Sequence, residues 1–361
     1  MPAAKLRIAV LYEPSDNTLD GAPAGAAQQQ KRAGRRKPRE RIARGHERRS
    51  VSREGRPKFD REEVLEALRR LGHDPFFYEL AGEKRLLGLS QLEADLVFNL
   101  VEAYEGDDAL EPHVAAFLDL LEVPYTGAGP QGLLIAQDKA LAKKIFHFHK
   151  IRTPYFGVFY KGTAELPDDL QFPLIVKPAN EDGSVGIDSG SVVKTVRELL
   201  ERLHLLQEKF DCPALIEQYI EGRELYVGVL GNEKPEALPV IELDLSRLPK
   251  GMPKIAGREV KWEKGTEAYE STRSQPARNL EPDLTRRLQE TAVAVYKALK
   301  LRDYGRIDMR LTPGGEIHVI EANPNPWLAP EAELAIAGKE AGLSYDEMLW
   351  RIVESALARY L

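Results

Sequence analysis

Cysteine is nearly absent from this chain of 361 residues, in which Cys212 is the single example. One cysteine excludes an internal disulfide framework and fits a reducing compartment. Cys212 precedes Pro213 at the edge of an apolar strand, so we expect a buried structural thiol rather than a nucleophile. The chain also lacks an apolar run of the ~18 residues that a membrane span needs, and it lacks a secretion signal. We therefore expect a soluble cytoplasmic protein.

A large excess of charge of either sign is also lacking. The net charge is −6 and 30% of the residues are charged, which disfavours a general affinity for nucleic acid or for an anionic membrane. The exception is the segment 14–61, which has no hydrophobic period and carries a basic run from Lys31 to Arg49. Such composition favours a mobile surface insertion, and a basic arm for nucleic acid or a partner protein is the alternative.

The remaining sequence has the patterns of an α/β protein with two or three domains. LRIAVLY (6–12), HDPFFYEL (73–80) and DLVFNLV (95–101) predict buried strands. REEVLEALRRLG (61–72) and EPHVAAFLDLLEV (111–123) predict helices with one apolar face. This alternation predicts a small doubly wound parallel sheet that closes near residue 127.

The next segment combines lysines with a glycine-rich turn. A helix over 136–151 places Lys139, Lys143 and Lys144 on its exposed side, where solvation is the usual role. FPLIVKPANEDGSVGI (172–187) then predicts a strand that delivers Lys177 to a turn with Gly183, Ser184 and Gly186. Backbone N–H groups in such a turn, together with the lysine, can hold phosphates. The spacing matches neither a P-loop nor a dinucleotide fingerprint.

Two glutamates flank the turn of a predicted strand-turn-strand unit, ALIEQYIEGRELYVGVLG (214–231). Glu217 lies before the turn at Glu221-Gly222, and Glu224 lies after it. A carboxylate here could accept hydrogen bonds from ribose hydroxyls while the strand backbone reads an adenine. It could equally be the ordinary charge of an edge strand.

Residues 304–327 predict a hairpin with four polar side chains. The turn signal Thr312-Pro313-Gly314-Gly315 separates two apolar segments. Because strand side chains alternate, Arg306 and Asp308 share one face of the first strand, and Glu321 and Asn323 share one face of the second. Oxygen ligands without cysteine or paired histidine favour Mg²⁺ held together with substrate phosphates. The alternative is an amphipathic hairpin with a solvated polar face.

In chain order, these segments resemble successive signature segments of the ATP-grasp fold and, more narrowly, of the D-alanine–D-alanine ligase family. The resemblance covers about residues 95–361 and rests on PYTGAG, QDKALAKK, PLIVKPANEDGSVG, LIEQYIEGREL, YGRIDMRL, EANPNPW and AIAGKEAGLSYDEMLWRI. It implies an α/β (α+β) ATP-grasp fold with an N-terminal doubly wound parallel-sheet domain. The implied domains are a Rossmann-like unit (1–127), a central subdomain with the glycine loop (128–220) and a C-terminal catalytic and metal-binding domain (221–361).

The resemblance also implies an activity and a set of site residues. Ligases of this family use ATP and Mg²⁺ to convert a carboxylate into an acylphosphate, which an amine then attacks. The implied catalytic residues are Arg306, Ser184 and Lys261. The implied ATP-binding residues are Lys139, Lys177, Gly183, Ser184, Val185 and Gly186 at the phosphates, Glu217, Gln218, Tyr219 and Ile220 at the adenine, and Glu224 at the ribose. Asp308, Glu321 and Asn323 are the implied ligands of two Mg²⁺ ions, with Mn²⁺ as an alternative.

This chain departs from the family pattern at several substrate positions. Gly183 replaces the first serine of the glycine loop, Trp262 stands where the family has a tyrosine, and Glu102-Ala103 replaces a histidine-glycine pair. After Asn323 the chain has Pro324-Asn325-Pro326-Trp327. Glu331 and Glu333 then lie near the position where the family has a Ser-Leu pair that binds the carboxylate of the second substrate. Acidic side chains repel a carboxylate and attract an amine. The glutamate that binds the first amino group has two candidates here, Glu13 and Glu47.

We therefore predict a carboxylate–amine ligase with an altered acceptor site. Its expected partners are small-molecule amino-acid or peptide substrates and a second copy of the chain in a homodimer, and neither a membrane nor nucleic acid. Two other functions are consistent with the sequence. One is a non-catalytic ATP-binding regulator or scaffold with a basic partner-binding arm, and the other is an ATP-grasp enzyme that ligates onto a peptide C-terminus.

Overall fold

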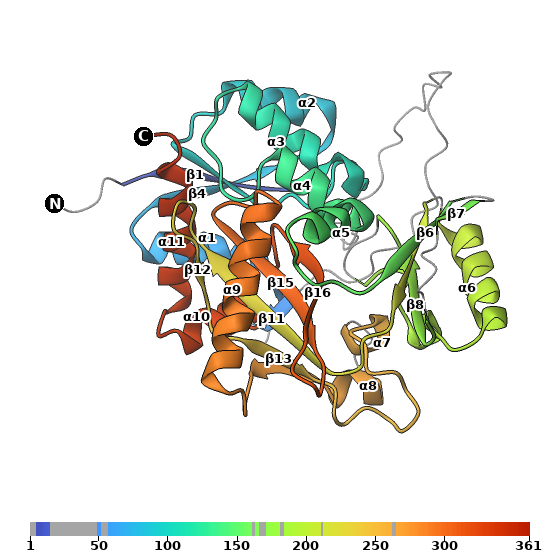
Figure 1. Cartoon of the computed structure of the whole chain (residues 1–361). Coiled ribbons are helices and arrows are strands. Elements are labelled where there is room, and N and C mark those ends of the chain that lie inside the picture. The colour runs from blue at the N-terminus through green and yellow to red at the C-terminus, as the bar shows by residue number, and fades with distance from the viewer. Residues whose placement is uncertain are drawn as a thin grey trace, which may run out of the picture.

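The computed structural model describes residues 5–14, 49–51, 57–160, 163–165, 171–180, 184–210, 212–261 and 265–361. Within these ranges the strands form an N-terminal, a central and a C-terminal sheet and a short strand pair (Figure 1). The fold is mixed α/β, as the sequence predicts.

The N-terminal sheet has parallel strands in the order β4-β1-β5, which confirms the predicted doubly wound unit. Strand β1 buries Ile8 to Leu11 completely because a parallel strand is covered on both faces. The elements of this part are β1 (Arg7–Tyr12), α1 (Asp60–Arg70), β4 (Asp74–Glu79), α2 (Gly82–Gly88), a 3₁₀ turn (Leu89–Gln91), β5 (Leu96–Asn99), a second 3₁₀ turn (Asp108–Leu110) and α3 (Glu111–Leu120).

The predicted insertion ends earlier in the structure than in the sequence analysis. β2 (Arg49–Val51) pairs antiparallel with β3 (Pro57–Phe59), and α1 begins at Asp60. The prediction of a segment without regular structure up to residue 61 is therefore wrong for these residues. Its remaining part, residues 15–48 and 52–56, lies outside the described residues.

The central sheet is antiparallel, with the order β7-β6-β10-β8-β9. Helix α6 covers one face of it and buries Leu203 and Leu206 against Val176 and Ile216. Cys212 packs against the same core but is only half-buried, which corrects the prediction of a fully buried thiol. The elements here are α4 (Pro130–Gln137), α5 (Lys139–Phe148), β6 (Phe156–Tyr160), β7 (Thr163–Glu165), β8 (Leu174–Pro178), a 3₁₀ turn (Ser189–Ser191), β9 (Val192–Val193), α6 (Val196–Lys209) and β10 (Ala214–Gln218).

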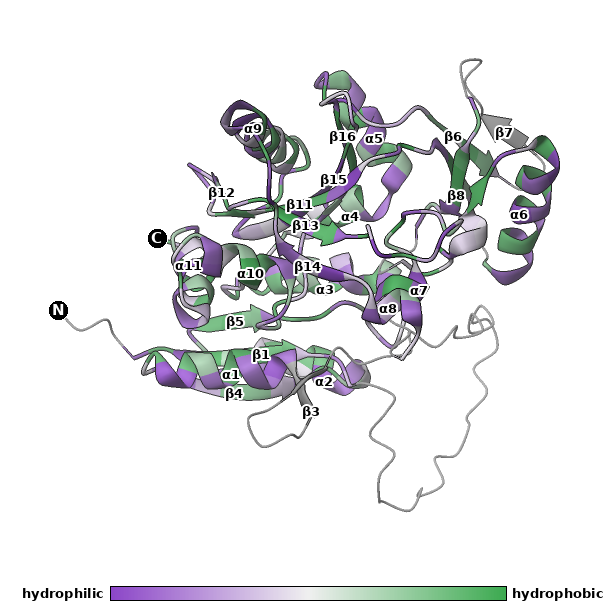
Figure 2. Cartoon of the chain, turned by 90° about the horizontal axis from the view of Figure 1, so that it is seen from below, coloured by the Kyte–Doolittle hydropathy of each residue, from purple (hydrophilic) through white to green (hydrophobic). Residues whose placement is uncertain are grey.

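The C-terminal sheet has the order β14-β13-β11-β15-β16, and β12 pairs with β11. Helix α9 covers one face, whereas α10 and α11 lie between the other face and the N-terminal sheet (Figure 2). No helix in the described part has the length and apolar character that crossing a membrane requires. The elements are β11 (Arg223–Leu230), β12 (Glu236–Ala237), β13 (Ile241–Asp244), α7 (Arg258–Lys261), α8 (Glu267–Glu270), β14 (Arg273–Pro276), α9 (Pro282–Ala298), β15 (Tyr304–Leu311), β16 (Ile317–Asn323), α10 (Glu333–Glu340) and α11 (Tyr345–Leu357).

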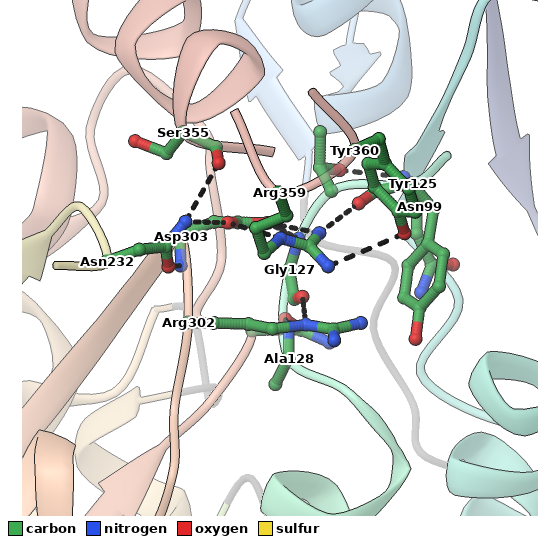
Figure 3. A network of polar contacts seen from close by, with 12 residues as sticks. Asn99, Tyr125, Gly127, Ala128, Asn232, Arg302, Asp303, Ser355, Arg359 and Tyr360 are labelled. Carbon is green, nitrogen blue, oxygen red and sulfur yellow. Dashed lines mark hydrogen bonds and ion pairs between the residues drawn. The ribbon is translucent and has the colours of Figure 1, made fainter. Parts of the chain in front are cut away.

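A buried carboxylate joins the N-terminal part to the C-terminal sheet (Figure 3). Asp303 is 0% exposed, and its oxygens accept hydrogen bonds from Arg359 (2.9 and 3.1 Å), from Asn232 Nδ2 (2.9 Å) and from the backbone N–H of Gly127 (2.8 Å). Arg359 also donates to the carbonyl oxygen of Tyr125. These contacts, which we call the Asp303 joint, satisfy a charge that would otherwise be costly to bury.

Candidate functional site

The predicted hairpin forms in the C-terminal sheet. β15 and β16 pair antiparallel, with Arg306 opposite Asn323 and Asp308 opposite Glu321. The pairing register shifts at a bulge after Asp308, next to these side chains. The side chains of Arg306 and Asp308 are only 12% and 4% exposed, so the alternative of a solvated polar face is wrong for β15, whereas the side chain of Glu321 on β16 is 26% exposed.

Arg306 is held between two carboxylates. Its Nε and Nη2 donate to the two oxygens of Asp308 at 2.8 and 2.9 Å, and its Nη1 donates to Glu333 Oε2 at 3.0 Å. Ser274 Oγ donates to the other oxygen of Glu333 at 2.9 Å, and the ring of Tyr226 lies 5.0 Å from the guanidinium carbon. Paired, charge-assisted bonds of this kind fix a guanidinium in one orientation.

Opposing charges set the ionisation of the hairpin carboxylates. Burial favours protonation of Glu321, but the positive charges of Lys139, Lys177 and Lys261 outweigh burial and lower its pKa. For Asp308 burial prevails over Arg306, and the pKa is raised. Lys139 Nζ lies 3.8 Å from Glu321 Oε2. A carboxylate that stays ionised beside several cations suits phosphate and metal chemistry.

The donor set of the hairpin fits Mg²⁺ shared with a nucleotide. Asp308, Glu321 and Asn323 offer carboxylate and amide oxygen atoms from paired positions of β15 and β16. Over the described residues, no group of three or more His, Cys, Asp or Glu side chains is arranged to hold a metal by itself. Mg²⁺ held by one or two carboxylates usually shares substrate phosphates, and its binding here stays a prediction.

Two of the three lysines of α5 are buried, which corrects the prediction that Lys139 and Lys143 lie on the exposed side of the helix. Lys143 is 0% exposed and Lys139 is 4% exposed, whereas Lys144 is exposed. The Asp138 carboxylate caps the helix by accepting from the N–H of Leu141. The helix thereby presents Lys139 and Lys143, which are four residues apart, on one face toward the two sheets.

Glu217 lies between two buried lysines, Lys143 of α5 and Lys177 of β8. Its Oε1 is 2.5 Å from Lys143 Nζ and its Oε2 is 2.6 Å from Lys177 Nζ. Burial alone would raise the pKa of Glu217, but the two lysines lower it. Burial lowers the pKa of Lys143 to about 8. Because β10 is an inner strand and Glu217 is 1% exposed, the alternative of an edge-strand charge is wrong here.

Glu224 is also on an inner strand, so the edge-strand alternative is wrong for it as well. Its carboxylate forms an ion pair with Arg310, which also donates to the carbonyl oxygen of Gly222 at 3.2 Å. β10 and β11 belong to different sheets, and Gly222 makes the crossing between them. A Cβ at residue 222 would lie 2.0 Å from the carbonyl oxygen of Leu311, so only glycine fits.

The segment between the two sheets has its backbone fixed on both sides. The N–H of Gln218 donates to the carbonyl oxygen of Tyr155 at 2.9 Å, and the N–H of Tyr219 donates to that of Pro173 at 3.0 Å. Ile220 is 7% exposed. The predicted adenine-binding segment is therefore an ordered link, and its contact with a nucleotide stays a prediction.

The described part of the glycine loop is attached to a second loop. Ser184 Oγ donates to the carbonyl oxygen of Ala256 at 2.7 Å, and the N–H of Arg258 donates to that of Ile187 at 2.8 Å. A Cβ at Gly186 would lie 2.6 Å from Pro178 Cγ, so the loop packs closely after Val185. These contacts place α7, which carries Lys261, against the loop. Gly183 and Trp262 lie outside the described residues, as does Glu47.

Asn325, in the segment that departs from the family pattern, contacts the N-terminal part. Its Oδ1 accepts from the N–H of Ala128 at 3.0 Å, and its Nδ2 donates to Glu111 at 3.3 Å. A pocket beside it is lined by Asn99, Glu102, Tyr304 and Trp327 among others. Sequence reasoning missed the role of Asn325, because no local pattern reports a contact across nearly 200 residues.

Comparisons with known proteins show the family to which the chain is related. The family model described as "D-ala D-ala ligase C-terminus" matches residues 153–354. An uncharacterized protein, y4sG, of Sinorhizobium fredii is 34% identical over 82% of this chain and 87% of its own length. The D-alanine–D-alanine ligase of Aquifex aeolicus is 32% identical over 80% of this chain and 92% of its own.

Solved structures show the same fold. A D-alanine–D-alanine ligase of Bacillus anthracis complexed with ATP has a TM-score of 0.69 at 22% identity, over 99% of this chain and 98% of its own. A second structure of the Bacillus anthracis ligase has a TM-score of 0.67 at 25% identity, over 83% of this chain and 91% of its own. The fold is therefore the ATP-grasp fold, and the chain belongs to the D-alanine–D-alanine ligase family of ATP-dependent ligases.

Proposed function

We propose that this protein joins a carboxylate to an amine through an acylphosphate, at the expense of ATP. The observation that carries the proposal is the convergence of Arg306 and two acidic residues of one hairpin with the buried lysines Lys139 and Lys177. Lysines suit the phosphates of ATP, and a fixed guanidinium suits the charge that develops at the reacting acyl carbon. A scaffold or regulator that only binds ATP would not need the guanidinium.

The reaction has two steps. An oxygen of the first substrate's carboxylate attacks the γ-phosphorus, and ADP leaves. The amine of the second substrate then attacks the acyl carbon, inorganic phosphate leaves and the amine loses a proton. Lys139 and Lys177 would hold the phosphates, Lys261 would approach them from α7, and Ser184 would help position the first substrate. Arg306 would stabilise the negative oxygen of the tetrahedral intermediate.

Mg²⁺ would neutralise phosphate charge during the first step. Asp308, Glu321 and Asn323 would hold it together with the phosphates. Both oxygens of Asp308 accept from Arg306, but each carboxylate oxygen has a second lone pair and can still bind a cation. The adenine would lie along residues 217–220 and the ribose near Glu224.

We propose further that the amine acceptor differs from D-alanine. Glu333 stands near the place where family members grip the carboxylate of the second substrate, and its first oxygen accepts from Ser274 while the second accepts from Arg306. Glu331 lies nearby and is exposed. A second carboxylate entering this place would meet like charge, so an acceptor without a carboxylate at that end is favoured.

The test is ADP release from the purified protein with D-alanine as the carboxylate donor and a panel of amines as acceptors, including D-alanine itself, amino-acid amides and diamines. We expect turnover with D-alanine alone to be slow and turnover with a neutral or cationic acceptor to be faster. Turnover with D-alanine alone at a rate normal for such ligases would refute the changed acceptor. Glu321→Ala should abolish turnover and weaken Mg²⁺-dependent nucleotide binding, and an active Glu321→Ala enzyme would refute the metal assignment.

A further inference from the structure

Lys143 is a buried charge to which the proposed chemistry gives no role. It lies on α5, is 0% exposed, and donates to Thr153 Oγ1 at 2.7 Å in addition to its 2.5 Å contact with Glu217. The Thr153 hydroxyl donates in turn to the carbonyl oxygen of Val319 on β16 at 2.8 Å. Its contacts with Thr153 and Glu217 therefore hold the Lys143 ammonium away from any bound ligand. A lysine is rarely buried this completely without a reason.

The charges in direct contact around Glu217 do not cancel. One carboxylate forms ion pairs with two ammonium groups, those of Lys143 and Lys177. Burying an isolated carboxylate is costly, so Glu217 requires at least one cation, but one is sufficient. The second cation is then a surplus positive charge in a place shielded from water.

The two lysines differ in where they can act. Both lysines interact electrostatically with Glu321 of the hairpin, but Lys177 lies on β8, the strand that leads into the glycine loop. Lys143 donates to the hydroxyl of Thr153, and this hydroxyl is in turn hydrogen-bonded to the backbone of β16. The surplus charge can therefore be used only through Lys177.

We propose that Lys143 is a positioning residue, the permanent counter-ion of Glu217, and that it releases the charge of Lys177 for the phosphates of ATP. This inference rests on the proposed function, in which Lys177 holds phosphate. Without Lys143, Glu217 retains Lys177 as its only cation in direct contact, and a phosphate then competes with a buried ion pair. With Lys143, Glu217 stays neutralised when Lys177 turns to the nucleotide.

Calorimetric titration of the full-length protein with ATP and Mg²⁺ tests the proposal through a double substitution. Lys143→Met has nearly the same shape and leaves Glu217 paired with Lys177, so we expect it to fold and to bind ATP about tenfold or more weakly. Glu217→Gln removes the carboxylate that retains Lys177, so in this background we expect Lys143→Met to weaken ATP binding by less than about threefold. The reference is the Glu217→Gln variant, because Glu217 is itself assigned to the adenine site. Lys144→Met, the neighbouring exposed lysine of the same helix, should change nothing.

The outcomes separate this inference from the proposed function. Wild-type affinity in Lys143→Met, or an equal loss from Lys143→Met in the wild-type and Glu217→Gln backgrounds, would overturn the inference and leave the ligase proposal intact. A wild-type protein that binds no ATP would overturn both. A merely structural role for Lys143 predicts the same loss in both backgrounds, whereas the counter-ion role predicts a loss only where Glu217 is present. In turnover assays the loss should appear in the KM for ATP rather than in kcat.

Discussion

Two clusters of buried charged side chains lie on the two antiparallel sheets, and the net charges of the two clusters have opposite signs. On the central sheet, Glu217 is bonded to two lysines, so the cluster has a surplus positive charge. On the C-terminal sheet, Arg306 is bonded to Asp308 and Glu333, so that cluster has a surplus negative charge. Because a buried surplus attracts the opposite charge, the first suits phosphates, and the second suits a metal ion or an amine.

Helix α5 connects the two clusters. Its Lys139 lies 3.8 Å from Glu321 on the hairpin, and its Lys143 contacts Glu217 on the central sheet. An ATP molecule between the sheets would direct its phosphates along this helix toward the metal ligands. The difference between the clusters predicts that nucleotide binding and acceptor choice can be altered separately. Each of the following predictions changes one cluster.

The largest effect is expected from Arg306→Ala. It removes the donor to the developing negative charge and leaves Asp308 and Glu333 without their shared partner, so kcat should fall about 10²- to 10³-fold or more. ATP affinity should change little, because the central cluster is intact. ADP release and calorimetry on the same preparation measure both quantities. An equal loss of ATP affinity would show that the two clusters do not act separately.

Lys177→Met should have the next largest effect, on the other cluster. It removes the surplus charge directly, and the loss of one charge-assisted contact corresponds to about 10- to 100-fold in ATP affinity. Glu217 remains paired with Lys143, so the thermal midpoint should change less than in a variant that leaves a buried charge alone. Unchanged ATP affinity would exclude Lys177 from the phosphate site.

Glu333→Ser should shift acceptor preference. Removing one carboxylate from the C-terminal cluster should raise turnover with D-alanine relative to the preferred acceptor by about three- to tenfold, since the charge of Glu333 is already partly neutralised by Arg306. Glu340→Ser, at the exposed C-terminal end of the same helix, is the matched control. A uniform fall in kcat with every acceptor would instead show that Glu333 acts only by holding Arg306.

The smallest effect is a pH dependence of ATP affinity. Burial lowers the pKa of Lys143 to about 8, so the side chain is charged at pH 7 and largely neutral at pH 9. Neutral Lys143 leaves Lys177 as the cation in contact with Glu217, so ATP affinity should fall a few-fold as pH rises through 8. Glu321 and His318 on β16 also face Lys143, and burial lowers the pKa of His318, which therefore stays neutral over this range.

Titrating Glu217→Gln from pH 7 to pH 9 provides the comparison for this prediction. With no carboxylate to neutralise, the charge of Lys143 no longer controls Lys177, so the affinity should be nearly constant. A wild-type affinity that is also constant would contradict the coupling.

The sequence predicted the hairpin of the C-terminal cluster well but misjudged the central one. Alternation along two adjacent strands is a local property, so Arg306, Asp308, Glu321 and Asn323 could be placed on shared faces without the fold. The burial of Lys143 is not local. Helical periodicity shows which face of α5 is polar, but a second sheet that covers this face can be known only from the tertiary structure.

Glu217 and Glu224 illustrate the same limit. The pattern around Glu221-Gly222 gives two strands and a turn, and it cannot say that the strands belong to different sheets. Once the crossing at Gly222 is known, both glutamates lie on inner strands and each needs a cation, Lys143 and Lys177 for one and Arg310 for the other. Sequence reasoning found both glutamates and the two lysines, but not which of them pair, and it missed Arg310.

The Asp303 joint has a consequence for the order of folding. It unites groups from residues 125–127, 232, 303 and 359, and its bonds span up to 234 positions of sequence. Forming contacts between such distant residues costs the entropy of closing a long loop before the contacts add to the stability of the fold. The N-terminal sheet can therefore form early during synthesis, but the joint that holds it against the C-terminal sheet is complete only after residue 359 has emerged. Completion of the active site should be among the last events of folding.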